Sequence, residues 1–319
     1  MQASTRTLST PDGVALFAYR WLPESPPKAA VQIVHGLAEH AGRYARLAQA
    51  LTGAGYAVYA SDHRGHGLTQ ATPADLGFFA ERDGWRRLVD DVWLLNRQIA
   101  ADHPGLPLFL IGHSMGSFLA QQFISEHGEA LAGVVLSGTD GKPPALASVG
   151  RLVARIERLR LGPRGRSGLI HALAFGAFNK AFAPTRTPAD WLSRDPAEVD
   201  KYVADPLCGF IATTQGWIDL LDALQQIARP ELQALIPKRL PIHVISGSTD
   251  PVSGGTKRLQ QLLAAYRGAG LEQVTHRFYE GARHEIFNET NRGEVTRDLI
   301  LWLDGVIAAR ADPARRPHA

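Results

Sequence analysis

Ser114 lies at the centre of a five-residue motif, G-H-S-M-G over residues 112–116, whose spacing suits an exposed nucleophile. The apolar run 106–111 before the motif predicts a short buried strand, and residues 118–124 predict a helix with one apolar face. The flanking glycines allow the strand and helix backbones to approach at a point where a Cβ would clash. The Met115 amide then opens the helix, where a free N–H can stabilise an oxyanion. A tight strand-to-helix turn that merely contains a serine is the alternative interpretation.

A serine nucleophile needs a base, and that base needs a carboxylate to orient it. Two later segments supply these groups in the order serine, aspartate, histidine. A predicted strand over 242–246 leads into a turn that carries Asp250, and a predicted strand over 274–279 leads into a loop that carries His284. We therefore expect Ser114, Asp250 and His284 to form a catalytic triad at the carboxyl edge of a sheet. Taken singly, the aspartate is equally well a helix cap and the histidine a solvated loop residue.

The loop after the strand predicted over 29–34 is expected to supply the second oxyanion donor. The backbone amide of Leu37 is the candidate, paired with the amide of Met115; a tight turn without a catalytic part is the alternative. His63 and His66 share a loop, but no nearby Cys, Asp or Glu completes the spacing of a metal site. The sequence thus predicts no metal and no cofactor.

Alternating strands and helices are expected to position these residues. An antiparallel hairpin comes first, and strands then alternate with helices up to about residue 140. Between about 140 and 237 only helical segments interrupted by Pro and Gly occur, and the alternation resumes at 241. Such alternation predicts an α/β fold, a mostly parallel sheet with helices on both faces. We expect residues 1–139 and 238–310 to form the core, 140–237 an inserted helical lid, and 311–319 a disordered tail. The expected strands cover 5–9, 14–22, 29–34, 57–60, 106–111, 133–136, 241–247 and 274–279.

The composition is that of an ordinary globular chain. Among 319 residues, 34 are basic and 31 acidic, so the net charge of +3 does not indicate a nucleic-acid partner. The single cysteine, Cys208, excludes an internal disulfide and is compatible with a reducing cytoplasm. The first residues lack the apolar region of a signal peptide, and no apolar run is long enough to span a bilayer. We expect a cytoplasmic protein; the sequence does not determine its oligomeric state.

Within the expected lid, apolar residues recur at helical spacing and alternate with arginines. A basic amphipathic helix of this kind is typical of segments that rest on an anionic lipid surface. Peripheral membrane contact through the lid is therefore one interpretation. The other is that the apolar face covers the active site while the arginines are solvated. The apolar positions are Val149, Leu152, Val153, Ile156 and Leu159, and the basic ones are Arg151, Arg155, Arg158 and Arg160.

Several stretches together resemble the α/β-hydrolase superfamily and, within it, the monoacylglycerol lipase and lysophospholipase branch. They are H-G-x-x-E-H-x-x-R-Y at 35–44, D-H-R-G-H-G at 62–67, the serine motif at 112–116, D-P-L at 205–207, G-S-T-D at 247–250 and Y-E-G-A-x-H at 279–284. The resemblance implies an α/β-hydrolase fold with an eight-stranded sheet, the triad and oxyanion donors named above, and a small lipid ester as substrate.

The resemblance also implies roles for residues outside the triad. Glu39 and Arg43 are expected near the head-group end of the substrate pocket, and Tyr202 is expected to line the same region from the lid. A salt bridge that fixes the loop is the alternative for Glu39 and Arg43. Ser117 departs from the family, which usually has a glycine at that position.

The activity implied is hydrolysis of a monoacylglycerol to fatty acid and glycerol through an acyl-enzyme. Lysophospholipase and broad carboxylesterase activities are alternatives, followed by a proline-type aminopeptidase or an acyltransferase, and by a non-catalytic binding protein that has kept the pocket. A peptidase needs an anionic site for the substrate amine, which the basic lid does not favour. Haloalkane dehalogenases and epoxide hydrolases are disfavoured because they use a carboxylate where this chain has Ser114.

Overall fold

A computed structural model of the protein describes residues 1–141 and 146–311. One sheet of eight strands runs through it in the order β1-β2-β4-β3-β5-β6-β7-β8. β2 pairs antiparallel with both β1 and β4, and all other neighbours are parallel. The mostly parallel eight-stranded sheet is therefore confirmed. The strands are β1 (Gln2–Ser9), β2 (Ala15–Leu22), β3 (Ala29–Val34), β4 (Tyr56–Ser61), β5 (Leu108–His113), β6 (Gly133–Ser137), β7 (Ile242–Gly247) and β8 (Val274–Tyr279).

The strand that precedes Ser114 is displaced by two residues from its predicted position. β5 begins at Leu108, after Pro107, whose ring nitrogen has no hydrogen to donate to a neighbouring strand. It extends to His113 because that residue pairs with Ser137 of β6. Every residue of β5 is buried, as expected for a central strand covered on both faces.

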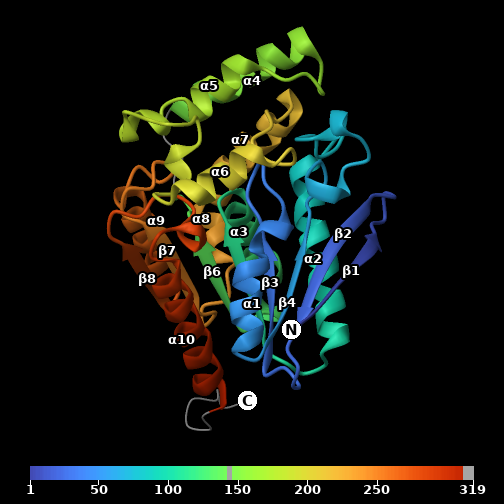
Figure 1. Cartoon of the computed structure of the whole chain (residues 1–319), viewed down its shortest axis with the longest axis vertical. Helices are drawn as coiled ribbons and strands as arrows, with labels where there is room; N and C mark the ends of the chain where they lie inside the picture. The colour runs from blue at the N-terminus through green and yellow to red at the C-terminus, as the bar shows by residue number, and fades with distance from the viewer. Residues whose placement is uncertain (142–145, 312–319) are drawn as a thin grey trace.

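Helices cover both faces of the sheet. α1 and α10 pack on one face, where Leu47 and Leu51 share an apolar cluster with Val295 and Leu299. On the other face α2, α3 and α9 contribute to a second cluster. Figure 1 shows the sheet between these two layers. The helices are α1 (Ala45–Gly53), α2 (Gly84–Asp102), α3 (Met115–His127), α9 (Lys257–Gly268) and α10 (Arg292–Ala311).

The segment between β6 and β7 is helical, as expected. Its helices lie over the end of the sheet that carries the carboxyl ends of the parallel strands (Figure 1). Within the described part of this segment, extended backbone is paired at one place, between Arg166 and Thr213. The predicted tail over 311–319 lies, apart from Ala311 at the end of α10, outside the described residues. The helices of the insertion are α4 (Leu146–Leu161), α5 (Gly168–Phe175), α6 (Pro196–Ala204), α7 (Thr214–Ile227) and α8 (Pro230–Ala234).

Across residues 1–141 and 146–311, none of the helices combines the length and the apolar character that crossing a bilayer requires.

Candidate active site

Ser114 sits in a strained turn between β5 and α3. Its backbone has φ 52° and ψ −123°, a conformation that residues other than glycine rarely adopt. A Cβ on Gly112 would lie 2.4 Å from the Gly116 carbonyl oxygen, and one on Gly116 would lie 2.1 Å from the carbonyl oxygen of Val34. The strand–helix contact predicted from the two glycines is thus present. It holds the serine at the carboxyl edge of the sheet.

Ser117 strengthens the same turn. Its hydroxyl is buried and donates a 2.6 Å hydrogen bond to the Ser114 carbonyl oxygen. The departure from the family glycine therefore adds a polar contact behind the elbow without filling the cavity in front of it.

Asp250 and His284 meet although 34 residues separate them. His284 Nδ1 lies 2.9 and 3.0 Å from the two oxygens of the Asp250 carboxylate, and both side chains are buried. Asp250 also accepts hydrogen bonds from the Val252 amide at 2.9 Å and the Ser246 hydroxyl at 3.2 Å. Because a carboxylate only accepts, the hydrogen of the neutral imidazole is on Nδ1, which leaves Nε2 as the free base.

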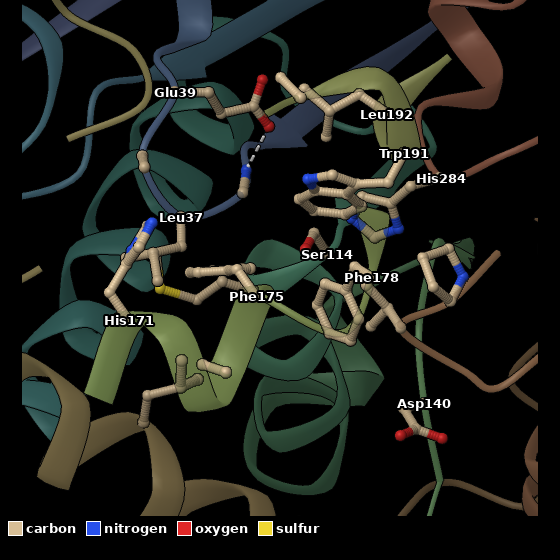
Figure 2. Close-up of a pocket in the computed structure, with 18 of the residues that line it drawn as sticks. Leu37, Glu39, Ser114, Asp140, His171, Phe175, Phe178, Trp191, Leu192 and His284 are labelled. Carbon is tan, nitrogen blue, oxygen red and sulfur yellow. Dashed lines mark hydrogen bonds between the residues drawn. The ribbon is translucent and has the colours of Figure 1, made fainter. Parts of the chain in front are cut away.

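His284 and Ser114 lie beside each other on the wall of one cavity (Figure 2). Burial by itself lowers the pKa of a histidine, but the Asp250 carboxylate outweighs burial and raises the pKa of His284 above its usual 6.5. A carboxylate in this position stabilises the imidazolium that forms when the histidine removes a proton from a serine. The three side chains predicted from separate segments are thus brought to one edge of the sheet.

The loop before α1 lies directly against the nucleophile. A Cβ on Gly36 would be 3.1 Å from Ser114 Cβ, and the next residues, Leu37 and Ala38, line the same cavity. Ala38 has φ 57°, a second strained position in the site. Met115, whose amide opens α3, lines the same cavity. The arrangement therefore suits backbone amides of Leu37 and Met115 that face a developing oxyanion.

Arg43 joins two acidic side chains behind this loop. It forms a 2.6 Å ion pair with Glu39 and a bidentate pair with Glu285, with both distances 2.7 Å. Glu39 also accepts hydrogen bonds from the Gly36 amide at 2.6 Å and the Tyr44 hydroxyl at 2.9 Å. The structure thus forms the salt bridge that was the alternative interpretation of Glu39 and Arg43, although Glu39 also faces the cavity.

Glu285 was not identified from the sequence. Burial would raise its pKa, but Arg43 lowers the pKa of Glu285 to about 2, so this carboxylate is ionised beside the candidate base. The sequence does show an acidic residue directly after His284, which could have marked Glu285 as a candidate. Its partner lies 242 positions away, so only the fold reveals their pairing.

Tyr202 reaches the site from the insertion. Its hydroxyl donates a 3.1 Å hydrogen bond to the Ala38 carbonyl oxygen, and its ring centroid lies 4.9 Å from Arg43 Cζ. It also lines the cavity, as expected. Tyr202 therefore connects the helical insertion to the loop that carries Leu37.

The cavity itself is about 590 Å³ and mainly apolar. Three aromatic side chains of the insertion, Phe175, Phe178 and Trp191, lie over Ser114 (Figure 2). The Trp191 ring centroid is 5.0 Å from that of His284. The sequence did not single out these aromatics, because their spacing in an irregular segment carries no periodic signal. An apolar cavity of this volume accommodates a single acyl chain better than a charged substrate.

Two sets of possible metal ligands lie outside the triad. His63 and His66 are buried in a turn and contact backbone carbonyl groups. In the described part of the chain, one group of three side chains, His40, Asp205 and Cys208, brings possible ligand atoms together.

Comparison with known proteins places this geometry in a family. Residues 25–291 match the family model described as "Serine aminopeptidase, S33". The chain is 30% identical to a monoacylglycerol lipase of Mycolicibacterium smegmatis, over 91% of this chain and 93% of the relative. It is also 30% identical to the human monoglyceride lipase, over 92% of this chain and 88% of the relative.

Among solved structures, a thermostable carboxyl esterase from Bacillus coagulans in complex with glycerol superimposes with a TM-score of 0.89. The two are 28% identical, over 96% of this chain and 99% of the esterase. The chain therefore belongs to the serine aminopeptidase S33 family of α/β-hydrolases, in its monoacylglycerol lipase branch.

Proposed function

We propose that this protein is a serine carboxylic-ester hydrolase that cleaves a monoacylglycerol into a fatty acid and glycerol. The observation that carries the proposal is the Asp250–His284 pair beside Ser114 on the wall of an apolar cavity. The chemistry of that arrangement is acyl transfer to a serine. Similarity to the bacterial and human lipases supports the choice of a single-chain glycerol ester as substrate.

The mechanism follows from the roles of the three side chains. His284 Nε2 removes the Ser114 proton as the serine oxygen attacks the ester carbonyl, and Asp250 stabilises the imidazolium. The amides of Leu37 and Met115 receive the oxyanion. His284 then protonates the departing glycerol, and a water molecule repeats the sequence to release the fatty acid.

The side chains that line the cavity suggest how the substrate is oriented. Glu39, Glu285 and Tyr202 bring polar groups to the wall, and Phe175, Phe178 and Trp191 bring apolar ones. We assign these polar groups to the glycerol head group and the aromatic side chains to the acyl chain. The similar carboxyl esterase was solved in complex with glycerol, which is compatible with a glycerol ester as substrate. In this assignment Arg43 acts by holding the two carboxylates in place.

Labelling with a fluorophosphonate probe tests the nucleophile. The variant Ser114→Ala is expected to lose all labelling while its circular dichroism stays unchanged. Ser117→Ala, three residues further along the chain, is the matched control and is expected to keep its labelling. Undiminished labelling of the Ser114 variant would refute the assignment.

A substrate series separates this activity from its alternatives. We expect hydrolysis of monoacylglycerols of graded chain length to exceed that of di- and triacylglycerols, lysophospholipids and aminoacyl naphthylamides. Cavity-lining carboxylates each have an arginine partner, Arg43 for Glu39 and Glu285, and Arg258 for Asp140, which disfavours binding of a peptide amine. Preferential cleavage of the aminoacyl substrate would make the protein a peptidase instead.

We further propose that residues 140–237 act as a lid that contacts lipid surfaces. Leu152, Ile156 and Leu159 of α4 are 60%, 55% and 85% exposed, so much of the apolar side of this helix lies at the protein surface. Val149 and Leu173 are both exposed and also line the cavity, so the apolar surface continues into the cavity. A substrate dissolved in a bilayer would then reach Ser114 without crossing water.

Vesicle flotation tests the lid proposal. The double variant Leu152→Asp/Leu159→Asp is expected to reduce binding to vesicles that contain anionic lipid. Leu301→Asp is the matched control, because Leu301 is 69% exposed on α10, outside the insertion. Equal flotation of both variants and the unmodified protein would contradict the proposal. The cytoplasmic location expected from the single cysteine also stays a proposal, and cell fractionation tests it.

A further inference from the structure

Three possible metal ligands meet where the insertion contacts the core. His40 comes from the loop before α1, and Asp205 and Cys208 come from the turn after α6. One ligand atom of each side chain lies within 4.8 Å of the other two. His40 Nε2 and Asp205 Oδ2 are 2.9 Å apart. None of the three belongs to the triad.

The backbone around this group is already ordered. Within the turn, the Asp205 side chain accepts a 2.9 Å hydrogen bond from the Leu207 amide, and its carbonyl accepts one of 3.0 Å from the Cys208 amide. The Gly209 amide then donates a 2.9 Å bond to the Ala38 carbonyl, which docks the turn on the loop that carries His40. A ligand that binds here therefore orders little additional chain.

The electrostatic surroundings favour a cation. The Cys208 thiol lies within electrostatic range of three carboxylates, Asp205, Glu39 and Glu285, and of one guanidinium, Arg43. The local charge is therefore negative even before the thiol ionises.

We propose that His40, Asp205 and Cys208 bind a divalent cation of Zn²⁺ type, with water from the cavity as the fourth ligand. Imidazole, carboxylate and thiolate are the donors that Zn²⁺ takes, and in a tetrahedral site they lie about 3.3–3.7 Å apart. His40 and Asp205 separate by a few tenths of an ångström to reach that spacing, and the Cys208 sulfur moves inward by about 1 Å or less. The thiol proton passes to solvent when the sulfur binds the cation.

Such a cation would tie the insertion to the core. Asp205 and Cys208 belong to the insertion, while His40 follows the loop that carries Leu37 and Ala38. The bound ion would add coordinate bonds between segments that already meet through the Gly209–Ala38, Tyr202–Ala38 and His40–Asp205 hydrogen bonds. This site is independent of the proposed ester hydrolysis.

Cobalt titration of the full chain tests the proposal, with Co²⁺ as the probe. Because Cys208 is the single cysteine, any sulfur-to-cobalt charge-transfer band reports this residue alone. We expect the band to saturate at one equivalent and to disappear when Zn²⁺ is added. Asp205→Asn keeps the oxygen that accepts from Leu207 but loses the charge, and it should weaken binding at least tenfold. His40→Gln should do the same, whereas His276→Gln, an exposed histidine of β8, should bind like the unmodified protein.

Two results would overturn the proposal. The first is the absence of a charge-transfer band at any Co²⁺ concentration that leaves the protein folded. The second is a band whose midpoint is unchanged in Asp205→Asn, which would mean that the cysteine binds cobalt without the other two side chains. Neither readout depends on esterase activity, so failure of the metal site and failure of the proposed function are distinguishable.

Discussion

Three buried histidines behind the active-site loop are expected to make the protein acid-sensitive. His35, His63 and His66 have ring centroids 4.0 to 6.0 Å apart, and all three are at most 2% exposed. His35 Nε2 accepts a hydrogen bond from the His63 amide, so its protonation would break that bond. His66 Nδ1 donates to the Arg64 carbonyl, which leaves His66 Nε2 buried and, among the residues that the structure describes, without a partner. Each ring is therefore neutral in the folded protein.

Burial and the neighbouring histidine lower the pKa of His63 to about 3, and burial lowers the pKa of His66 to about 4. Burial also lowers the pKa of His35. In the unfolded chain the value is about 6.5, so the unfolded state binds more protons as the pH falls below that value. Each of His63 and His66 then removes about 0.8 kcal/mol of unfolding free energy at pH 6 and about 2 kcal/mol at pH 5. About 4 kcal/mol at pH 5 is a large part of the stability of an ordinary domain.

Urea unfolding followed by circular dichroism at pH 8, 6 and 5 measures this loss. The variant His66→Gln is expected to be less stable at pH 8, yet to lose about 2 kcal/mol less than the unmodified protein between pH 8 and pH 5. The exposed residue His276 supplies the control His276→Gln, which should keep the original pH dependence. His284 acts in the opposite sense, since its raised pKa gives stability that is lost as the pH rises through the pKa of the folded state. This contribution is the same in the unmodified protein and in both variants, so it does not affect the comparison. An identical pH dependence in His66→Gln would refute the reasoning.

Three further results are expected. Because the pKa of His284 is raised, the acid limb of kcat/KM in ester hydrolysis assays should lie above pH 6.5, and a limb at or below that pH would contradict the assignment of the base. In the same assays Asp250→Asn should lower kcat roughly 10⁴-fold. Arg43→Gln leaves two buried carboxylates without their partner and should cost about 3–5 kcal/mol in urea unfolding, with a loss under 1 kcal/mol as the contrary outcome. Ser117→Gly removes the bond to the Ser114 carbonyl and adds a helical glycine, so stability should fall by about 2 kcal/mol while probe labelling persists; loss of labelling would show that the serine is needed to form the elbow.

The candidate site was largely predictable because its parts follow strand ends. Ser114 comes directly after β5, and Asp250 and His284 lie in the loops that follow β7 and β8. Parallel strands deliver their carboxyl ends to one edge of the sheet. The glycines around Ser114 were equally informative, since the close backbone contacts that they permit are present.

The roles of charged residues were less predictable. Glu39 and Arg43 share a motif, and their spacing is compatible with either substrate contact or a salt bridge. The structure shows the salt bridge, since Glu285 forms a bidentate pair with the Arg43 guanidinium. Substrate contact by Glu39 stays a prediction. The periodic pattern of α4 likewise indicated an amphipathic helix but not the direction of its apolar side, which depends on how the insertion packs.

The sequence by itself determined the alternation of strands and helices, the candidate catalytic residues and their order along the chain. These properties are local, because hydrophobic periodicity and turn residues act over a few positions. Only the tertiary structure decided which distant side chains meet: Arg43 with Glu285, Tyr202 with Ala38, and His40 with Asp205 and Cys208. Such contacts depend on the packing of whole elements against one another, and no short stretch of sequence encodes that packing.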